Sequence, residues 1–279
     1  MKNISMNVSG KIDSIFTNTI AEILAASQVV SVEILLVGAL ARDIYFEHIY
    51  EIKSMRATTD IDFAVMVGSI DEYYALKKYL ISYYGFAETK IEHQLEKNNT
   101  LVDLVPFGEK AFPNKKVRVK DSDNEMDISG FDEVFSASIN VLLSETPRVE
   151  IRMPDAAGMI ILKLFSFEDN PNRRKDAEDI YFMMSSFEHI IDSDFVYSNY
   201  NHLLLKHNYD LKQISYAILG EQAKAILNDE NIGKLRDIVI KETKEDSEFQ
   251  LIMKMKKSDD IGNFENILKM MKIYSDAIN

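Results

Sequence analysis

Short apolar runs alternate with longer segments of helical periodicity along the first half of the chain. An apolar, β-branched run predicts a strand at residues 32–37, alternating patterns predict strands at 61–67 and 148–153, and a further strand is expected at 100–105. Apolar residues at helical spacing predict helices at residues 14–26, 40–50 and 71–84, the last of them ended by Gly85. We expect Pro106 and Gly108 to end the third strand, and residues 116–128 to form a hairpin with its turn at 121–124. The pattern predicts a mixed sheet with helices packed against it.

After Pro154 the pattern changes to helical periodicity with few strand signals. Asp155 is placed to cap a helix that runs to about Phe167. An Asn-Pro-Asn break at residues 170–172 separates this helix from a second one at residues 173–185. The expected fold class is therefore α+β, with a mixed sheet of α/β type in a domain of residues 1–153 and an all-helical C-terminal domain of residues 154–279.

Composition narrows the class of protein. With 279 residues, 46% of them hydrophobic, the chain can bury one large core or two modest ones. The absence of cysteine excludes disulfides, thiolate metal ligands and cysteine nucleophiles. No apolar run approaches the roughly 20 residues of a membrane helix, and residues 1–13 lack the apolar core of a signal peptide. We therefore expect no membrane contact and a cytoplasmic location.

The formal net charge of −13 bears on nucleic acid as a partner. A protein whose whole surface follows a phosphate backbone is expected to be basic, so any such contact must be local. A solvated face is the simpler interpretation of each basic cluster. The candidate clusters are Lys115, Lys116, Arg118 and Lys120, then Arg173, Arg174 and Lys175, and finally Lys254, Lys256 and Lys257.

Two acids stand out at the start of the second predicted strand. Asp60 and Asp62 are two residues apart, so on a strand both side chains project from the same face. Neighbouring carboxylates repel each other, and the pair is costly unless a cation neutralises it. Mg²⁺ prefers oxygen ligands and accepts phosphate oxygens in its remaining positions. The alternative is a polar strand edge.

A third acid, Asp103, lies within the otherwise apolar run Leu101–Val105. A lone acid in such a run is rare unless it is paired or binds a metal. If this strand lies beside the strand of Asp60 and Asp62, three carboxylates converge and two metal ions about 3.5–4 Å apart become possible. Asp103 would then also be placed to accept a proton from an attacking hydroxyl. An ion pair with Arg42 or Arg56 is the alternative for Asp103.

The first predicted strand passes through Gly38 directly into a helix. Such a turn lets the backbone approach a phosphate closely, with the helix N–H groups directed at it. Many strand-to-helix turns carry glycine for packing alone. This turn is a candidate phosphate-binding turn because it lies just upstream of the paired acids.

In their order and spacing, these motifs resemble the polymerase-β-type nucleotidyltransferase superfamily, in particular the AbiEii-like nucleotidyltransferases, which include toxins of type IV toxin–antitoxin systems. The resemblance covers about residues 32–184. In that group a Gly-Gly or Gly-Ser turn precedes an Arg-x-Thr-x-Asp-hydrophobic-Asp strand, and a helical lysine and a Lys-Asp-x-x-Asp helix follow. The matching segments here are Gly38-Ala39, Arg56 to Asp62, Val102 to Pro106, Lys163, and Lys175 to Asp179.

The resemblance implies a nucleotidyltransferase fold for residues 1–153 and an enzyme that transfers a nucleoside monophosphate from a nucleoside triphosphate to a hydroxyl group. It implies an acceptor that is tRNA or a protein, and a cognate antitoxin as partner. Two Mg²⁺ ions are the expected cofactors. The expected site residues are, as metal ligands, Asp60, Asp62 and Asp103; as further catalytic residues, Lys163 and Asp176; and around the triphosphate, Gly38, Ala39, Arg42, Arg56 and Thr59. Ala39 departs from the family pattern, because it replaces a serine or glycine and removes a hydroxyl contact.

Structural alternatives remain open for several of these residues. Arg42 is more simply read as the salt-bridge partner of Asp43 than as a substrate ligand, and Arg56 either binds phosphate or holds its loop. Lys163 either meets the triphosphate or extends to water. Asp176 and Asp179 share a helix face, and either act in the site or serve as a cap and as partners of Arg173.

Two other functions compete with nucleotidyl transfer. Phosphatases with an aspartate nucleophile also use Asp-x-Asp, but there the acids end an apolar strand, whereas here the apolar residues follow Asp60 and Asp62. The second alternative is a catalytically degenerate nucleotidyltransferase fold that serves as a binding or regulatory protein, which the alanine at position 39 favours. Walker-type and dinucleotide-binding fingerprints are absent from the sequence.

Overall fold

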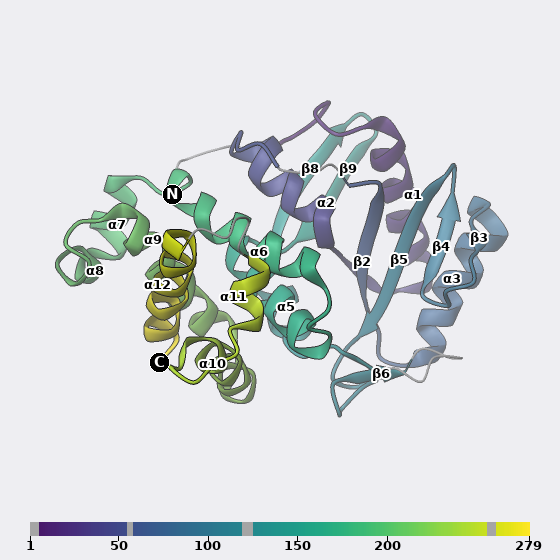
Figure 1. Ribbon diagram of the computed structural model, residues 1–279. Helices are drawn as coiled ribbons and strands as arrows, with labels where there is room; N and C mark the ends of the chain where they lie inside the picture. Colours follow the sequence, from purple (N-terminus) through teal and green to yellow (C-terminus); the bar gives the residue numbers. More distant parts are fainter. Residues whose placement is uncertain (1–5, 55–57, 119–124, 256–260) are drawn as a thin grey trace. The chain divides into compact units, whose positions relative to one another are not determined.

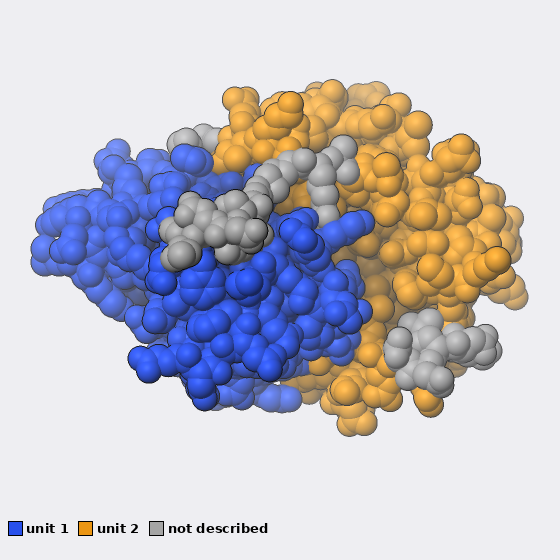
Figure 2. All heavy atoms as spheres, in the orientation of Figure 1, with its two compact units in different colours: residues 1–3, 156–279 blue, residues 4–155 orange. Residues whose placement is uncertain are grey.

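The computed structural model describes residues 6–54, 58–118, 125–255 and 261–279 (Figure 1). The chain divides into two compact units, which we call the sheet unit (residues 4–155) and the helical unit (residues 156–279). Figure 2 colours the sheet unit orange and the helical unit blue. Within the described ranges every strand belongs to the sheet unit, as the sequence pattern predicts. The α+β class, a mixed sheet followed by an all-helical region, is therefore confirmed.

The sheet unit contains a seven-stranded mixed sheet with the strand order β3-β4-β5-β2-β1-β9-β8, and a separate two-stranded sheet of β6 and β7. The strands are β1 (Glu33–Val37), β2 (Asp60–Met66), β3 (Ala87–Glu88), β4 (Gln94–Lys97), β5 (Thr100–Phe107), β6 (Lys116–Arg118), β7 (Glu125–Asp127), β8 (Ile139–Glu145) and β9 (Arg148–Met153). The helices of this unit are α1 (Ser14–Val30), α2 (Gly38–Asp43), the π-helix η1 (Ile44–Ile49), α3 (Ile70–Tyr84) and α4 (Phe131–Ser136).

The centre of the sheet is formed by β2, which runs antiparallel to β1 and parallel to β5. Because side chains alternate along a strand, one face of β2 carries Ile61, Phe63 and Val65, all of them buried. Helices α1 and α3 pack against each other, and the Tyr73 hydroxyl of α3 donates a hydrogen bond to the Leu104 carbonyl of β5 at 3.0 Å. The apolar core therefore lies on one face of β2, and Asp60 and Asp62 project from the other.

One strand continues further than its sequence indicates, because β5 passes through Pro106 and ends at Phe107. The amide of Leu104 donates to the carbonyl of His93, on the β4 side of β5. N–H groups two residues apart point to the same side of a strand, so the donor that Pro106 lacks would also face the β4 side. β4 does not extend that far, because its first residue, Gln94, pairs with Asp103. The proline thus removes no ladder hydrogen bond, and the expectation that it ends the strand is wrong.

The remaining strand predictions are confirmed at β1, β2, β9 and the β6–β7 hairpin. The expected hairpin turn at 121–124 lies outside the described residues. The sequence pattern did not predict the short helix α4 or the strands β3, β4 and β8. Of these, β4 lies beside β5, the strand that carries Asp103.

The helical unit begins directly after the sheet unit with α5 (Ala156–Asp169), and the expected break at 170–172 separates α5 from α6 (Arg174–Ser186). The following elements are the 3₁₀ turn η2 (Phe187–His189), α7 (Ser193–Asn199), α8 (Asn201–Lys206), α9 (Leu211–Ile226), α10 (Asp229–Thr243), α11 (Gln250–Met255) and α12 (Ile261–Ile278). Helices α9 and α12 pack closely at Gly220, where an added Cβ would lie 2.6 Å from the Cβ of Ala277. In the part of the chain that the structure describes, no helix combines the length and the hydropathy needed to cross a membrane.

Candidate active site

The candidate site begins where β1 ends and the chain turns into α2. Val37, the last residue of β1, pairs with Asp62 of β2, and Gly38 then adopts a positive φ of 73°. A Cβ on Gly38 would lie 1.9 Å from Oδ2 of Asp62 and 2.8 Å from its Cβ. The Asp62 side chain therefore packs directly on the backbone of the turn. Glycine is required there by its conformation and by the space that the carboxylate takes.

On the other side of β2, Asp103 of β5 is the register partner of Asp62. Neighbouring strands lie about 4.8 Å apart, and residues paired in register point to the same face. Asp60 lies two residues before Asp62 on that face, where its partner on β5 is Leu101. The topology thus brings Asp103 beside the two acids of β2, as the three-carboxylate hypothesis requires.

Short-range contacts hold two of these acids in place. The Thr59 hydroxyl donates to Oδ1 of Asp60 at 3.0 Å, and the Gln94 amide donates to Oδ1 of Asp103 at 2.9 Å. Within the described ranges neither Asp60 nor Asp103 forms an ion pair with a basic side chain. The alternative in which Arg42 pairs with Asp103 is therefore not observed. Arg56, the other alternative partner and a predicted triphosphate ligand, lies outside the described residues.

The oxygen donors suit a hard divalent cation, since half-buried carboxylates share one face of the sheet. Their side chains are not gathered around one point, however. Among the described residues, no group of three or more His, Cys, Asp or Glu side chains is close enough to hold a metal ion. The assignment of Asp60, Asp62 and Asp103 as Mg²⁺ ligands thus stays a prediction, supported by their strand positions and by their ligand chemistry.

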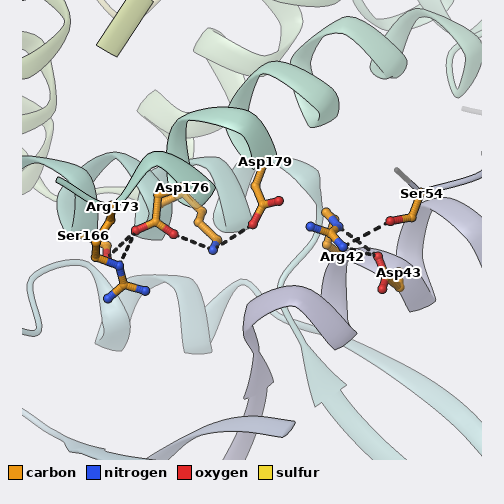
Figure 3. Close-up of polar contacts among 8 residues, drawn as sticks. Arg42, Asp43, Ser54, Ser166, Arg173, Asp176 and Asp179 are labelled. Carbon is orange, nitrogen blue, oxygen red and sulfur yellow. Dashed lines mark hydrogen bonds and ion pairs between the residues drawn. The ribbon is translucent and has the colours of Figure 1, made fainter. Parts of the chain in front are cut away.

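Arg42, expected near the triphosphate or in a salt bridge, forms the salt bridge (Figure 3). Its Nε and Nη2 both donate to Oδ1 of Asp43, at 2.9 and 2.6 Å, and Nη2 also donates to the Ser54 hydroxyl at 3.1 Å. The Arg42 residue is only 3% exposed. Burial raises the pKa of the Asp43 carboxyl above its ordinary value, and the charge of Arg42 opposes that rise.

Lys163 forms a second polar cluster with the two acids of α6, in the helical unit. Figure 3 shows both acids, Asp176 and Asp179. The Lys163 ammonium lies 2.7 Å from Oδ1 of Asp176 and 3.0 Å from Oδ2 of Asp179. Oδ2 of Asp176 also accepts from Arg173 at 2.7 Å and from the Ser166 hydroxyl at 3.0 Å. The side chains of Asp176 and Asp179 are 1% and 4% exposed. Lys163 therefore does not simply extend to water but joins α5 to α6, and the expected pairing of Asp176 with Arg173 is present.

Gln94 is the site residue that the sequence analysis missed. It comes from β4, a strand of four residues that the apolar pattern did not reveal. Its register partner is Asp103, so the amide reaches an acid that is nine residues away in sequence. No local signal could identify this glutamine, because its role depends on strand pairing.

No family model matches the chain, and no curated protein matches it. The solution structure of the antibiotic-resistance factor ANT(2″)-Ia is 16% identical, with a TM-score of 0.38 over 71% of this chain and 98% of that one. ANT(2″)-Ia in complex with adenylyl-2″-tobramycin is 15% identical, with a TM-score of 0.38 over 62% of this chain and 90% of that one.

A CCA-adding enzyme in apo form II is 10% identical, with a TM-score of 0.31 over 92% of this chain and 70% of that one. At these scores the similarities do not establish a shared activity. A functional proposal therefore depends on the residues and their placement.

Proposed function

We propose that the protein is a magnesium-dependent nucleotidyltransferase, which transfers a nucleoside monophosphate from a nucleoside triphosphate to an acceptor hydroxyl and releases pyrophosphate. The observation that carries the proposal is the facing pair Asp62 and Asp103 on the parallel strands β2 and β5, on the face opposite the apolar core. Asp60 adds a third carboxylate to this face, and the Gly38 turn lies against Asp62. An Asp-x-Asp sequence beside one further acid is the arrangement that the motif resemblance predicts.

In this proposal Asp60, Asp62 and Asp103 hold the Mg²⁺ ions. When bound, the metal neutralises charge on the triphosphate and lowers the pKa of a coordinated hydroxyl. Asp103, which faces Asp62, would also accept the proton of the acceptor hydroxyl. The backbone of Gly38 and Ala39, with Thr59 and Arg56, is the proposed triphosphate contact, while Arg42 supports this region through its salt bridge with Asp43. Catalysis would rest mainly on positioning and on charge neutralisation.

The roles of Lys163 and Asp176 are proposed from the motif resemblance alone. Lys163 is held by two carboxylates in the helical unit. An ammonium held in this way has a defined position, which a triphosphate ligand needs. Asp176 would act by holding Lys163.

The acceptor and the biological setting are finer proposals. From the resemblance to AbiEii-like nucleotidyltransferases, we propose that the acceptor is tRNA or a protein. We also propose that this protein is a toxin, neutralised by a cognate antitoxin. The net charge of −13 favours local contacts with an RNA acceptor over an extensive basic surface.

The test is transfer of label from α-³²P triphosphates. The protein is incubated with Mg²⁺, each of the four nucleoside triphosphates, and bulk tRNA or cell lysate, and the products are separated by gel. We expect one labelled product class, its loss with EDTA, and a loss of at least about 100-fold in Asp62→Asn and Asp103→Asn. Asp71→Asn is the matched control, because Asp71 is exposed near the start of α3, past the opposite end of β2.

Two results would remove the proposal. One is the absence of labelled product with any triphosphate, and the other is unchanged transfer in Asp62→Asn. A second candidate function, nucleotide binding without turnover, is favoured by Ala39, which offers no hydroxyl to the triphosphate. It predicts saturable binding of a triphosphate in calorimetry together with no transfer in the labelling assay.

A further inference from the structure

Asp103 lies between two neighbours on the same face of the sheet. On the β2 side its register partner is Asp62, and on the β4 side it is Gln94. The first neighbour is a carboxylate that repels it, and the second is an amide that can donate to it. The Asp103 carboxylate is therefore expected to accept its hydrogen bond from the Gln94 side.

The hydrogen bond is observed on that side. Nε2 of Gln94 lies 2.9 Å from Oδ1 of Asp103, and both side chains are partly buried. Gln94 is the one described residue that hydrogen-bonds to the Asp103 side chain. With Oδ1 engaged by Gln94, Oδ2 is the acceptor that remains for another ligand.

The backbone around Gln94 fixes the amide in this place. The amide N–H of Gln94 donates to the Ile91 carbonyl at 3.0 Å, and the amide of Leu104 donates to the His93 carbonyl at 2.7 Å. The strand β4 is thereby held in register at the residue that faces Asp103. The neighbouring Leu95 is fully buried, so a slip of one residue would expose it and turn Gln94 to the opposite face.

We propose that Gln94 is a positioning residue of the nucleotidyl-transfer site: its amide holds one oxygen of Asp103 and leaves the other for the divalent cation that Asp103 shares with Asp62. This inference rests on the proposed function, because it assigns a role toward the metal of that site. Outer-sphere hydrogen-bond partners of metal ligands typically contribute about 10–100-fold in metal affinity or activity. Gln94 does not contact the reacting atoms in this proposal.

The experiment compares three substitutions on β4. Gln94→Met keeps the length of the side chain and removes the donor. Gln94→His supplies a ring N–H at a similar reach and serves as the conservative rescue. Glu96→Gln, on an exposed position of the same strand, is the matched control. Thermal unfolding of each variant shows whether it is folded at the assay temperature.

The first readout needs no turnover: Mn²⁺ binding in the presence of a non-hydrolysable triphosphate, followed by electron paramagnetic resonance. We expect Gln94→Met to bind Mn²⁺ about 10–100-fold more weakly than the wild type, Gln94→His to recover most of that loss, and Glu96→Gln to bind normally. The second readout is labelled transfer against Mg²⁺ concentration. Gln94→Met should need about 10-fold more Mg²⁺ for half-maximal rate, with the KM for the triphosphate at saturating Mg²⁺ little changed.

The outcomes separate this inference from the proposed function. If the wild type binds Mn²⁺ and transfers nucleotide while folded Gln94→Met matches it in both assays, the positioning role is overturned and the proposed function stands. Equal losses in Gln94→Met and Gln94→His would also overturn it, because a structural role alone then explains them. If the wild type neither binds Mn²⁺ nor transfers nucleotide, the proposed function fails and this inference fails with it.

Discussion

Oδ2 of Asp62 occupies the position that a side chain on Gly38 would need, 1.9 Å from the site of a Cβ. The contact joins a strand-to-helix turn to the middle acid of the candidate site. A substitution at Gly38 must therefore strain the turn and displace the carboxylate at the same time. The Gly38 turn and the Asp-x-Asp strand, which are two separate motifs in the sequence, are thus in direct contact in the structure.

Gly38→Ala should destabilise the fold and reduce transfer. A left-handed φ costs a non-glycine residue about 1–2 kcal/mol, and displacing a packed side chain adds about 1–3 kcal/mol. Gly85→Ala is the matched control, because Gly85 has a similar φ of 70° but no atom within 4 Å of an added Cβ. Urea denaturation measures the loss of stability in each variant, and the difference between the two losses is the cost of displacing Asp62. Equal losses of stability in the two variants would contradict the prediction that a side chain at position 38 displaces Asp62.

Lys163→Met should lower the free energy of unfolding by about 3 kcal/mol, because it leaves Asp176 and Asp179 buried without the ammonium between them. The control is Arg174→Met, which removes an exposed pair with Glu178 and should cost less than about 0.5 kcal/mol. Both values are measured by urea denaturation without nucleotide. If Lys163 serves only to bind substrate, the stability of the free protein will not change.

Arg42→Lys should also destabilise the protein, by about 1–3 kcal/mol, because lysine cannot reproduce the two donations from Nε and Nη2 to Asp43. Arg148→Lys, at a side chain that is 67% exposed, is the control and should have almost no effect. We expect the KM for the triphosphate to be unchanged in Arg42→Lys at a temperature where it is folded. A several-fold rise in that KM would instead place Arg42 on the substrate.

Glu242 should make the stability depend on pH. Burial raises the pKa of its carboxyl above the ordinary 4.5, although the amides of Leu251 and Ile252 donate to it and oppose that rise. A raised pKa in the folded state means that protonation favours folding. This contribution is complete below the unfolded pKa and is lost as the pH rises through the folded pKa.

The stability of the wild type relative to Glu242→Gln should therefore be greatest below about pH 4.5 and should fall toward neutral pH. The fall amounts to about 1.4 kcal/mol for each unit by which the folded pKa exceeds the unfolded one. Urea denaturation between pH 4 and 8 measures it, and Glu245→Gln, at an exposed position of the same region, should follow the wild type. A difference that is constant or rises with pH would contradict this assignment.

Much of the local structure could be predicted from the chain. The strand and helix periods located β1, β2, β9, α1, α3, α5 and α6, because burial of one face imposes a period of 2 or 3.6 residues on the sequence. The same rule placed Asp60 and Asp62 on one face before any partner strand was known. Short elements with little apolar content, such as β3 and β4, leave no such period.

The roles of the charged residues could be predicted less well. Arg42 and Asp43 are adjacent in the chain, so their salt bridge was among the expected alternatives. The pairs of Lys163 with Asp176 and Asp179 join different helices, and the sequence offered only a choice between substrate and solvent for that lysine. A side chain finds its partner through the packing of whole elements, which a linear pattern does not contain.

By itself, the sequence determined the type of most elements, the change from sheet to helices after Pro154, and the three acids with a shared chemistry. These features depend on side-chain chemistry and on spacings of a few residues, which the chain carries locally. Only the tertiary structure decided that Asp103 faces Asp62, that Asp62 lies on Gly38, and that Gln94 holds Asp103. Each of these contacts depends on which strands pair and in which register, and that choice is made by the burial of the whole sheet face rather than by any one segment.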